Sequence, residues 1–482
     1  MELQVDPTLL YRVVDRGREL NAQYVEVRFQ SDYRVSVTTR NDRILAVSSS
    51  KSSGIGIRVL VNGALGFAAT NSTSSSDLLE LVERAVSQAS ATSRLRKKPI
   101  EFSDENLSSI KYSVDEKKRL EDFNVEEMIK LAMDIYSTAR SAVREVKLPF
   151  LVTDIRVHIQ EKLVVTSDGA YVESRIPRLH ISVLSTLLHP QKGTLQRSRE
   201  FGGSGGGELI ERWDPARAIS EEQVALERVL VSGIMPPREK VTVVLGPEVV
   251  GLIVHESAGH PMEADRILGR EASQAGESYV KPEYVGSYKI GNKYATVVDD
   301  PTLPNSYGFY LYDDEGVKAR PRYLYKEGLI NEPLHNRHTA RIFNVKSNGA
   351  SRSMNYASEP IVRMGNTYLV PGEMSFEELI EDVDLGVYVK SYMEWNIDDI
   401  RWNQRYVGLE AYIIRNGELA EPVRNPVLEF TTGWFYSNIL GVDRNLEFHP
   451  GICGKGEPSQ GVPVWFGGPN VKLSKMQIGV LA

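Results

Sequence analysis

Three residues in the middle of the chain combine the side chains that metal-dependent hydrolysis needs. His255, Glu256 and His260 form an H-E-x-x-x-H arrangement within VVLGPEVVGLIVHESAGHPMEAD. Imidazole nitrogens bind Zn²⁺ at about 2.0–2.1 Å, and a neighbouring carboxylate can take a proton from metal-activated water. The plainer alternative is two unrelated histidines beside a glutamate, so the motif by itself is a hypothesis.

The spacing of the two histidines predicts a break in the helix that carries them. On a regular α-helix five residues advance about 500°, which leaves the two rings about 140° apart. Gly259 lowers helix propensity, and Pro261 disfavours the α conformation at His260. We therefore expect a π-type bulge, or an early helix end, at residues 257–260, which would bring both rings to one side. A regular helix running through Pro261 would contradict this prediction.

A catalytic zinc site has three protein ligands, so a third must come from elsewhere. Cys453 lies in HPGICGKGE between two glycines, a tight loop that can present a thiolate, and it is our first candidate. His449 is an alternative four residues earlier. Glu263 and Asp265 are further alternatives, and either could instead orient a ligand imidazole as a hydrogen-bond acceptor.

The remaining polar residues give weaker signals. His335 and His338 lie in a polar stretch and are predicted to be surface histidines, and strand-like segments contain or flank three histidines without an expected chemical role: His158, His180 and His189. A developing oxyanion would need a further donor. Candidates from the downstream loops are Asn348, Arg352, Arg363 and Tyr368.

The N-terminal half alternates apolar and polar residues in the way that is typical of half-buried antiparallel strands. Residues 24–29 and 33–37 show this alternation, and residues 54–68 contain Asn62-Gly63, which favours a hairpin with a type I′ turn. Residues 78–91 and 125–144 have the apolar spacing of helices, with Asp77 as the expected N-cap of the first.

Two prolines in GIMPPRE, residues 233–239, follow a predicted helix at 220–231 and mark the expected domain boundary. We predict an α+β protein: residues 1–232 form an antiparallel sheet with flanking helices, and residues 233–482 form a strand-rich, metal-binding catalytic domain with one clear further helix at 375–382. Regular strand–helix alternation is absent, which argues against a doubly wound sheet. The glycine cluster at 202–207 lacks the context of a phosphate-binding loop and is predicted to be a flexible loop.

Composition excludes several classes of protein. The chain has 482 residues, a net charge of −7 and one cysteine, so an intrachain disulfide and a Cys-only zinc site are both excluded. The mild acidity argues against nucleic-acid binding. No apolar run is long enough to span a membrane, and charged residues interrupt the N-terminal segment where an export signal needs an apolar core. We expect a soluble cytoplasmic protein.

Several blocks of the sequence resemble the TldD/PmbA family of metalloproteases, specifically its TldD-like, metal-bearing branch. Besides the histidine block, they are GIGIRVLVNGALGFAAT (54–70), DDEGV (313–317), RMGNTYLVPGE (363–373), EAYIIRNGEL (410–419) and PGICGKGEPSQGVPVWFGGP (450–469). The resemblance covers nearly the whole chain, and the histidine and cysteine blocks are its most specific parts.

The resemblance implies a zinc metalloprotease in which His255, His260 and Cys453 bind Zn²⁺ and Glu256 is the general base. It also implies small, extended or unfolded polypeptides as substrates, such as microcin precursors and antitoxin-like chains. The expected partner is a paralogous TldE/PmbA-like subunit or a second copy of the chain. Alternatives are a non-catalytic zinc-containing peptide-binding or assembly subunit, and a metal-dependent amidase that acts on small molecules.

Two segments depart from the family pattern. Residues 392–406 are YMEWNIDDIRWNQRY, where the family has a glycine-glutamine-valine-aspartate pattern and a loop of small residues. Residues 457–460 are EPSQ, where the family has a shorter glycine-glutamine step. Both segments belong to the predicted catalytic domain, so they bear on substrate specificity and partner choice more than on the hydrolytic chemistry.

Overall fold

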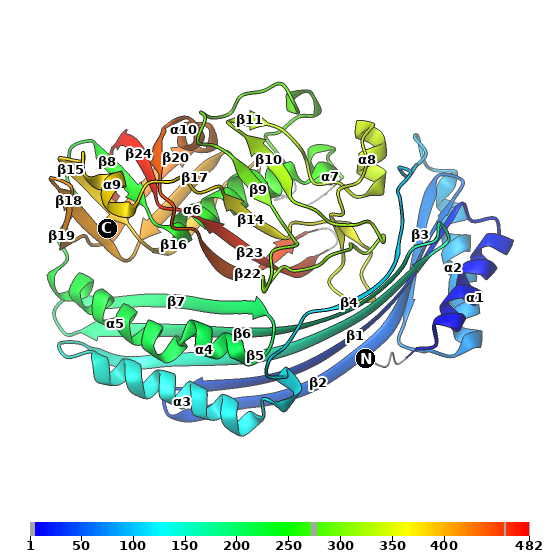
Figure 1. The fold of residues 1–482 in the computed structure, drawn as a ribbon, viewed down its shortest axis with the longest axis horizontal. Helices are drawn as coiled ribbons and strands as arrows, with labels where there is room; N and C mark the ends of the chain where they lie inside the picture. The colour runs from blue at the N-terminus through cyan, green and yellow to red at the C-terminus, as the bar shows by residue number, and fades with distance from the viewer. Residues whose placement is uncertain (1–4, 271–276, 457–458, 482) are drawn as a thin grey trace.

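A computed structural model describes residues 5–270, 277–456 and 459–481. Its N-terminal half is built on one strongly curved sheet of long strands (Figure 1). The strands are β1 Tyr24–Arg40, β2 Arg43–Val61, β3 Ala64–Thr70, β4 Ser109–Ser113, β5 Lys147–Thr166, β6 Tyr171–His189 and β7 Gly193–Ser204. The order is β3-β2-β1-β5-β6-β4, with β7 also paired to β6, and β4 is the strand that runs parallel to its neighbour.

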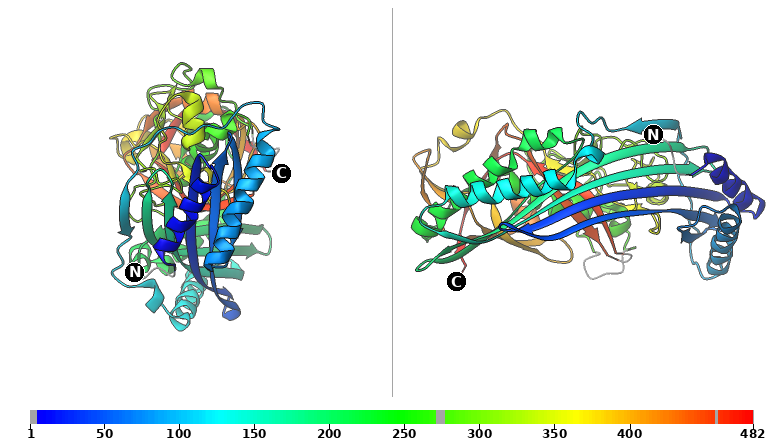
Figure 2. Two further views of the ribbon diagram at one scale, coloured as in Figure 1. Left: turned by 90° about the vertical axis from the view of Figure 1, so that its right-hand side faces the viewer. Right: turned by 90° about the horizontal axis from the view of Figure 1, so that it is seen from below.

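Side chains of opposite character occupy the two faces of this sheet, because successive residues of a strand point to opposite sides. In β1 the odd-numbered positions Val25, Val27, Phe29 and Val37 are buried hydrophobics, whereas Glu26, Arg28 and Asp32 are buried and charged. Helices cover the apolar face: α1 Pro7–Glu19, α2 Ser75–Ser93, α3 Val125–Ala142, α4 Glu208–Trp213 and α5 Pro215–Ser232. The charged face is turned toward the C-terminal half of the chain (Figures 1 and 2).

The C-terminal half consists of short strands joined by long loops. Its sheets follow the orders β11-β10-β9-β14-β23-β22, β19-β18-β15-β8-β24-β21 and β16-β17-β20-β25, with β12 and β13 as a separate pair. The strands are β8 Val241–Leu245, β9 Val297–Asp299, β10 Arg322–Lys326, β11 Leu329–Ile330, β12 Ser351–Arg352, β13 Ile361–Val362, β14 Asn366–Leu369, β15 Leu385–Val389, β16 Tyr392–Ile397, β17 Asn403–Gly408, β18 Ala411–Arg415, β19 Glu418–Pro422, β20 Pro426–Thr431, β21 Ile439–Val442, β22 Glu447–Lys455, β23 Gln460–Gly468, β24 Val471–Met476 and β25 Gly479–Val480. The helices are α6 Pro247–Val254, α7 Ala264–Ile267, α8 Arg337–Phe343, α9 Phe376–Ile380 and α10 Thr432–Ser437.

Buried ion pairs join the two halves. Arg58 of β2 contacts Glu26 of β1 and, across the interface, Glu315, with the latter pair 2.8 Å apart. Lys162 of β5 lies 2.9 Å from Asp314. The DDEGV block therefore supplies carboxylates that neutralise cations on the charged face of the sheet, which favours one arrangement of the halves because an unpaired buried charge is costly.

The α+β class, the antiparallel N-terminal sheet with flanking helices and the strand-rich C-terminal region are confirmed. The hairpin turn is also as predicted: Asn62 and Gly63 both have positive φ, 48° and 71°, as a type I′ turn requires. The first predicted helix instead begins three residues earlier, with Ser74 as its N-cap in place of Asp77. The division of the chain into domains at residue 233 stays a prediction.

Two expectations for loops and helices were wrong. Of the cluster 202–207 that was predicted to be a flexible loop, residues 202–204 instead belong to β7. A Cβ atom at Gly202 would lie 2.7 Å from Pro450, and one at Gly203 would lie 2.8 Å from the Asn305 carbonyl. Their small size allows β7 to pack closely on the C-terminal half, which no local pattern reveals. The far half also contains the short helices α7, α8 and α10 in addition to the predicted one, observed as Phe376–Ile380.

Candidate metal centre

The helix that carries the histidines departs from regular geometry where the spacing predicts. Helix α6 begins with Pro247 in its first turn and is followed by a π-helical turn, His255–Gly259, and a 3₁₀ turn, His260–Met262. In the π turn the His260 amide donates to the His255 carbonyl, a bond between residues five apart. The two imidazole rings consequently lie 5.0 Å apart at an interplanar angle of 81°. The prediction of a π-type bulge is confirmed.

Close packing holds this irregular helix against two neighbours. A Cβ atom at Gly251 would lie 2.9 Å from the backbone of Gly467, so glycine allows α6 to approach β23 closely. A Cβ atom at Gly259 would lie 2.1 Å from the sulfur of Met364. The small residues therefore bring the helix next to the hairpin of β22 and β23, which contains Cys453.

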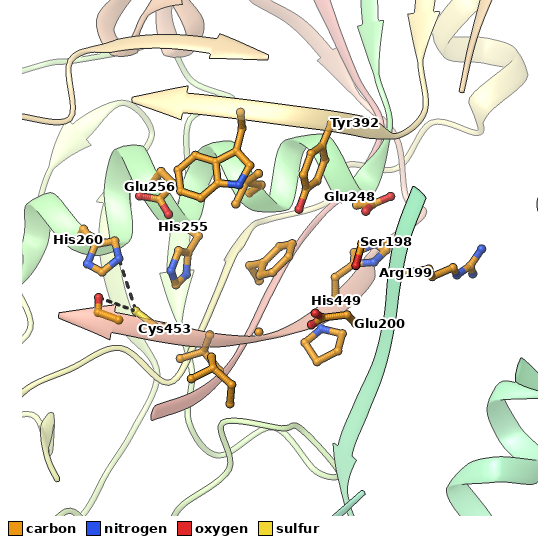
Figure 3. Close-up of a pocket in the computed structure, with 18 of the residues that line it drawn as sticks. Ser198, Arg199, Glu200, Glu248, His255, Glu256, His260, Tyr392, His449 and Cys453 are labelled. Atoms are coloured by element: carbon orange, nitrogen blue, oxygen red, sulfur yellow. Dashed lines mark hydrogen bonds between the residues drawn. The ribbon is translucent and has the colours of Figure 1, made fainter. Parts of the chain in front are cut away.

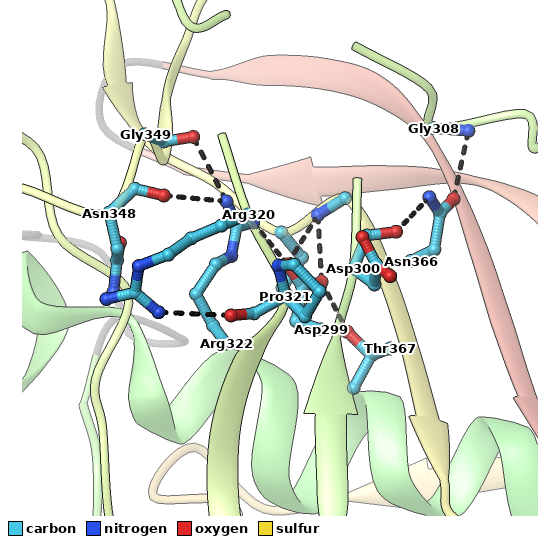
Figure 4. Close-up of polar contacts among 12 residues, drawn as sticks. Asp299, Asp300, Gly308, Arg320, Pro321, Arg322, Asn348, Gly349, Asn366 and Thr367 are labelled. Atoms are coloured by element: carbon cyan, nitrogen blue, oxygen red, sulfur yellow. Dashed lines mark hydrogen bonds and ion pairs between the residues drawn. The ribbon is translucent and has the colours of Figure 1, made fainter. Parts of the chain in front are cut away.

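A buried polar cluster fixes the loop that carries Met364 (Figure 4). Asp299 accepts hydrogen bonds from the Gly365 amide at 2.9 Å and from the Thr367 hydroxyl at 3.0 Å, and it pairs with Arg322. Burial opposes the charge on Arg322, but Tyr310 and Asp299 outweigh it and raise the arginine pKa. The ion pair thus supports the segment behind the π turn without lining the site itself.

The structure brings His255, His260 and Cys453 together although the cysteine is 193 residues beyond His260 in the chain. One possible ligand atom from each residue lies within 4.8 Å of the others, and all three residues are buried. Cys453 Sγ lies 3.4 Å from His260 Nε2 (Figure 3). A tetrahedral zinc site places sulfur and nitrogen ligands about 3.6 Å apart, so the observed separation fits a shared metal ion.

The protonation of these groups also fits a metal site, since metal ligands must be deprotonated. Burial lowers the pKa of His255 and of His260, which favours their neutral forms. Burial raises the pKa of the Cys453 thiol, but His260 and Arg363 outweigh this effect, and the net pKa is lowered. The Nδ1 atom of His255 is buried without a hydrogen-bond partner in the described part of the chain, as expected of a group awaiting a ligand.

Glu263 orients His260 and is itself held as a carboxylate. Its Oε2 atom lies 3.1 Å from His260 Nδ1. Burial opposes ionisation of Glu263, but Lys455, His260 and Arg266 outweigh it and hold the pKa well below its usual range. Of the two roles considered for Glu263, the contact corresponds to the orienting acceptor. Asp265 instead pairs with Lys455 at 2.7 Å.

The three clustered residues and Glu256 line one cavity of about 410 Å³ between the two halves. His449 lines the same cavity four residues before Cys453, but it lies outside the ligand cluster and stacks on Phe466. The N-terminal half contributes the segment 198–200 of β7. The site is therefore enclosed by both halves of the chain (Figure 3).

Arg401 lines this cavity and contacts Glu256, and the sequence analysis did not identify it. Its Nη1 atom donates to Glu256 Oε2 at 2.8 Å, and both side chains are largely buried. Arg401 has φ of +67°, a left-handed conformation that is uncommon for a residue with a side chain. It lies in the turn between β16 and β17, inside the atypical segment 392–406, and that departure from the family pattern was the available signal.

Several residues that the sequence analysis considered lie outside the metal cavity. None of Asn348, Arg352, Arg363 and Tyr368 is among the described residues that line the metal cavity. Arg363 donates to the carbonyls of Cys453 and Gln460. His335 is 2% exposed, so its prediction as a surface histidine was wrong; it packs against Phe343 and contacts Thr339. Of the atypical segment 457–460, Glu457 and Pro458 lie outside the described residues.

Comparison with known proteins identifies the family that has this fold. Residues 238–480 match the PmbA/TldA metallopeptidase C-terminal domain, residues 25–89 match PmbA/TldA metallopeptidase domain 1, and residues 118–229 match the PmbA/TldA metallopeptidase central domain. The chain therefore belongs to the PmbA/TldD family, as the sequence resemblance indicated.

Relatives of similar length carry the same class of name. A metalloprotease of Methanothermobacter thermautotrophicus is 30% identical and aligned over 99% of this chain and 100% of that protein. A zinc metalloprotease TldD homolog of Saccharolobus solfataricus is 25% identical, with 98% and 99% of the two chains aligned. Names of relatives thus associate this family with metal-dependent proteolysis.

Solved structures share the fold. TldE from Thermococcus kodakarensis superimposes with a TM-score of 0.71 at 17% identity, covering 98% of this chain and 100% of that one. A Thermotoga maritima protein described as a proposed modulator of a DNA gyrase has a TM-score of 0.75 at 19% identity, covering 98% and 99%. Within the described residues, no helix has the length and apolar character needed to cross a membrane.

Proposed function

We propose that the chain is a zinc-dependent metallopeptidase that hydrolyses peptide bonds in small, extended or unfolded polypeptides. The observation that carries the proposal is the convergence of His255, His260 and Cys453 within 4.8 Å, in a cavity that Glu256 also lines. Two imidazoles and a thiolate are a donor set that zinc prefers. The names of the metalloprotease relatives support the same assignment.

The residues have separate roles in this proposal. His255, His260 and Cys453 would hold the zinc ion, which when bound supplies a Lewis acid that activates water and polarises a carbonyl group. Glu256 accepts the proton of the attacking water and later returns it to the leaving amine. Arg401 bonds to one oxygen of Glu256, Oε2, and so fixes the direction in which the carboxylate points.

The cavity suits a substrate that is extended when it binds. It lies between two halves of the chain and is partly enclosed, which favours a single polypeptide strand over a folded domain. A paralogous TldE/PmbA-like subunit, or a second copy of this chain, is the proposed partner. A reducing compartment such as the cytoplasm is the proposed location, because oxidation of Cys453 would remove the thiolate ligand.

The decisive experiment replaces the proposed base while keeping the metal. Glu256→Gln should reduce cleavage of an unfolded polypeptide at least about a hundredfold, since general-base catalysis contributes about 10²–10⁴-fold. The zinc content should stay equal to that of the wild type. Glu221→Gln, on the exposed surface of α5, is the matched control and should cleave normally.

The outcomes separate the three candidate functions. Unchanged cleavage by the Glu256→Gln protein would contradict the protease mechanism. Zinc retention without any cleavage by the wild type, alone or with its paralogous partner, would favour the peptide-binding or assembly subunit, which does not require a base. Cleavage of short amides without cleavage of peptides would favour the small-molecule amidase.

A further inference from the structure

A second cavity, of about 430 Å³, lies beside the metal cavity between the charged face of the sheet and the C-terminal half. We name it the arginine cavity; its basic lining residues are Arg34, Arg156, His158, Lys162, Arg178, His180 and Arg352. The C-terminal half contributes the β22–β23 hairpin through Ile452 and residues 461–463. Ile452 lines both cavities and directly precedes Cys453, so the two cavities meet at the hairpin that carries the proposed zinc ligand.

The register of the sheet places basic residues directly opposite one another on this wall. Arg34 of β1 pairs with His158 of β5, and His158 pairs with Arg178 of β6. Asp32 contacts both Arg34 and His158, and burial lowers the pKa of His158, which favours its neutral form. The register therefore collects basic side chains on one wall, and the charge at this end of the wall is compensated.

Five of the seven basic side chains in the cavity already have a carboxylate partner, and one of them is His180, which lies 3.3 Å from Glu200. Arg34 lies 3.4 Å from Asp32, which also contacts His158. Arg156 bonds to Asp154 at 2.7 Å, and Lys162 bonds to Asp314 at 2.9 Å. These pairs satisfy the cations at the wall and leave two arginines, Arg178 and Arg352, whose charge must be balanced in another way.

Arg178 and Arg352 are buried without a carboxylate within ion-pair distance in the described part of the chain; their exposed fractions are 3% and 8%. Arg178 donates to the carbonyls of Tyr307 and Phe309 and to the Gln160 side chain. Arg352 donates to the carbonyls of Met364 and Pro463. These neutral acceptors fix the guanidinium groups in place but do not neutralise them.

The two arginines also disfavour each other's charge. Burial lowers the pKa of Arg178 to about 10, and the positive charge of Arg352 contributes to the same shift. Burial likewise lowers the pKa of Arg352, and Arg363 contributes to the shift, whereas Tyr310, Asp314 and Asp299 oppose it. Both residues line the cavity, and guanidinium groups form strong, directional hydrogen bonds with carboxylates.

We propose that the arginine cavity binds a carboxylate group of the peptide substrate through Arg178 and Arg352. The carboxylate belongs to an acidic side chain or to the C-terminus of the peptide. A chain that occupies the metal cavity and passes Ile452 enters the arginine cavity, so the site selects acidic peptides and sets their position relative to the metal centre. This proposal rests on the proposed peptidase function.

The test measures binding separately from cleavage. The full-length Glu256→Gln protein, which does not turn over in the proposed mechanism, is titrated with fluorescent octapeptides in an anisotropy assay. One series replaces Gln by Glu at successive positions of a neutral capped peptide, and a second compares a free C-terminal carboxylate with the amide. At least one acidic peptide should bind about tenfold or more tightly than its neutral counterpart, since hydrogen bonds to charged groups contribute about 1.5–3 kcal/mol.

Variants then assign the preference to the cavity. Arg178→Gln and Arg352→Gln should each remove most of this difference and leave binding of the neutral peptide within about twofold. Arg178→Lys and Arg352→Lys should preserve part of it, because they keep the charge but lose the planar geometry. Arg217→Gln removes an exposed arginine of α5 and is the control for net charge.

Each outcome either supports or contradicts the proposal. Equal affinity for all acidic and neutral peptides in the Glu256→Gln protein would overturn it, and this comparison stands even if an arginine variant fails to fold. Stabilisation of the wild type by inorganic phosphate without any preference among peptides would indicate a free-anion site and would also overturn it. A preference that persists after zinc is chelated, in a protein that shows no cleavage, would support the arginine cavity while contradicting the peptidase function.

Discussion

The metal cavity and the arginine cavity share Ile452 and the interface between the two halves, yet they collect opposite chemical groups. The first gathers His255, His260 and Cys453, neutral or anionic donors suited to a cation. The second gathers basic side chains, of which Arg178 and Arg352 have no carboxylate within ion-pair distance in the described part of the chain. The metal cavity also contains Glu256 and Glu248, but Arg401 lines it as well. Asp154 lines the arginine cavity, so the contrast concerns the central groups of each cavity and not every lining residue.

The two cavities also use different backbones. The histidines depend on a π turn, which brings residues five apart to one side of a helix. The arginine cavity depends on regular antiparallel register, which aligns Arg34, His158 and Arg178 across three strands. At this spacing the two histidines need an irregular backbone to converge, whereas an array of basic side chains needs only regular repetition. Both cavities are completed by residues from the two halves of the chain.

Removal of a proposed metal ligand should produce the largest effect and should affect one cavity alone. Cys453→Ala and His260→Ala should each lower zinc affinity at least about a hundredfold, because two remaining ligands cannot close the site. Chelator competition with measurement of bound metal gives the affinity. His338→Gln, outside the cluster, should retain zinc, and the preference of the Cys453→Ala protein for acidic peptides should persist.

Full zinc retention by the Cys453→Ala protein would contradict the proposed ligand set. The third ligand would then have to be His449 or an acidic residue. His449 lies on the same strand and lines the same cavity, so the double variant Cys453→Ala, His449→Ala would decide between these alternatives.

A smaller loss of zinc affinity, about 10- to 100-fold, is expected for Glu263→Gln, because the carboxylate that orients His260 is replaced. The change also leaves Lys455 near an uncharged group, so the protein should unfold at a lower temperature. Asp265→Asn removes the other carboxylate partner of Lys455 without touching His260. A fall in zinc affinity of the same size in both variants would mean that loss of stability, and not orientation of His260, causes it.

Arg401 tests whether the atypical segment 392–406 contributes to catalysis. Arg401→Gln should lower kcat about tenfold, because Glu256 loses the ion pair that directs it, while KM and zinc content change little. Arg401→Lys should restore part of the rate. A rise in kcat for Arg401→Gln would instead show that the ion pair restrains the base.

His335 is the reference for what burial alone does to a histidine, since it lies outside both cavities. Burial lowers its pKa to about 4 from 6.5. Below pH 6.5 the unfolded chain binds a proton that the folded chain excludes, so the free energy of unfolding should fall as pH decreases from 6.5 to 4, by about 3 kcal/mol. In denaturant unfolding, the free energy of unfolding of His335→Gln should depend less on pH than that of the wild type. The control His189→Gln should show the same pH dependence as the wild type.

An unchanged pH dependence in the His335→Gln protein would mean that other groups control acid stability in this range. His335 would then no longer show what burial alone does to the pKa of a histidine. The lowered pKa values of the histidines in the metal cavity would have no reference. His189, at the end of β6, is partly exposed and hydrogen-bonded to the Gln191 and Lys192 amides, so it is a suitable control.

Much of the local structure and part of the site could be predicted from sequence. Residue alternation predicted strands at 24–29 and 33–37, which the structure joins into the single strand β1, and Asn62-Gly63 predicted the turn. The positions of Gly259 and Pro261 predicted the break after α6, since both act through the local backbone. The predictions for Gly202, Gly203 and His335 failed because each depends on a distant segment, namely Pro450, Asn305 and the residues around Phe343.

The sequence by itself determined the fold class, the residue types available for metal binding and the irregular helix, because these depend on neighbours within a few positions. Tertiary structure alone decided that Cys453 meets His260 across 193 residues, that Glu263 orients the imidazole and that Arg401 contacts Glu256. It also decided that Arg178 and Arg352 share a cavity. Such pairings depend on how the two halves pack, and the energy of a buried charge is defined only when its surroundings are in place.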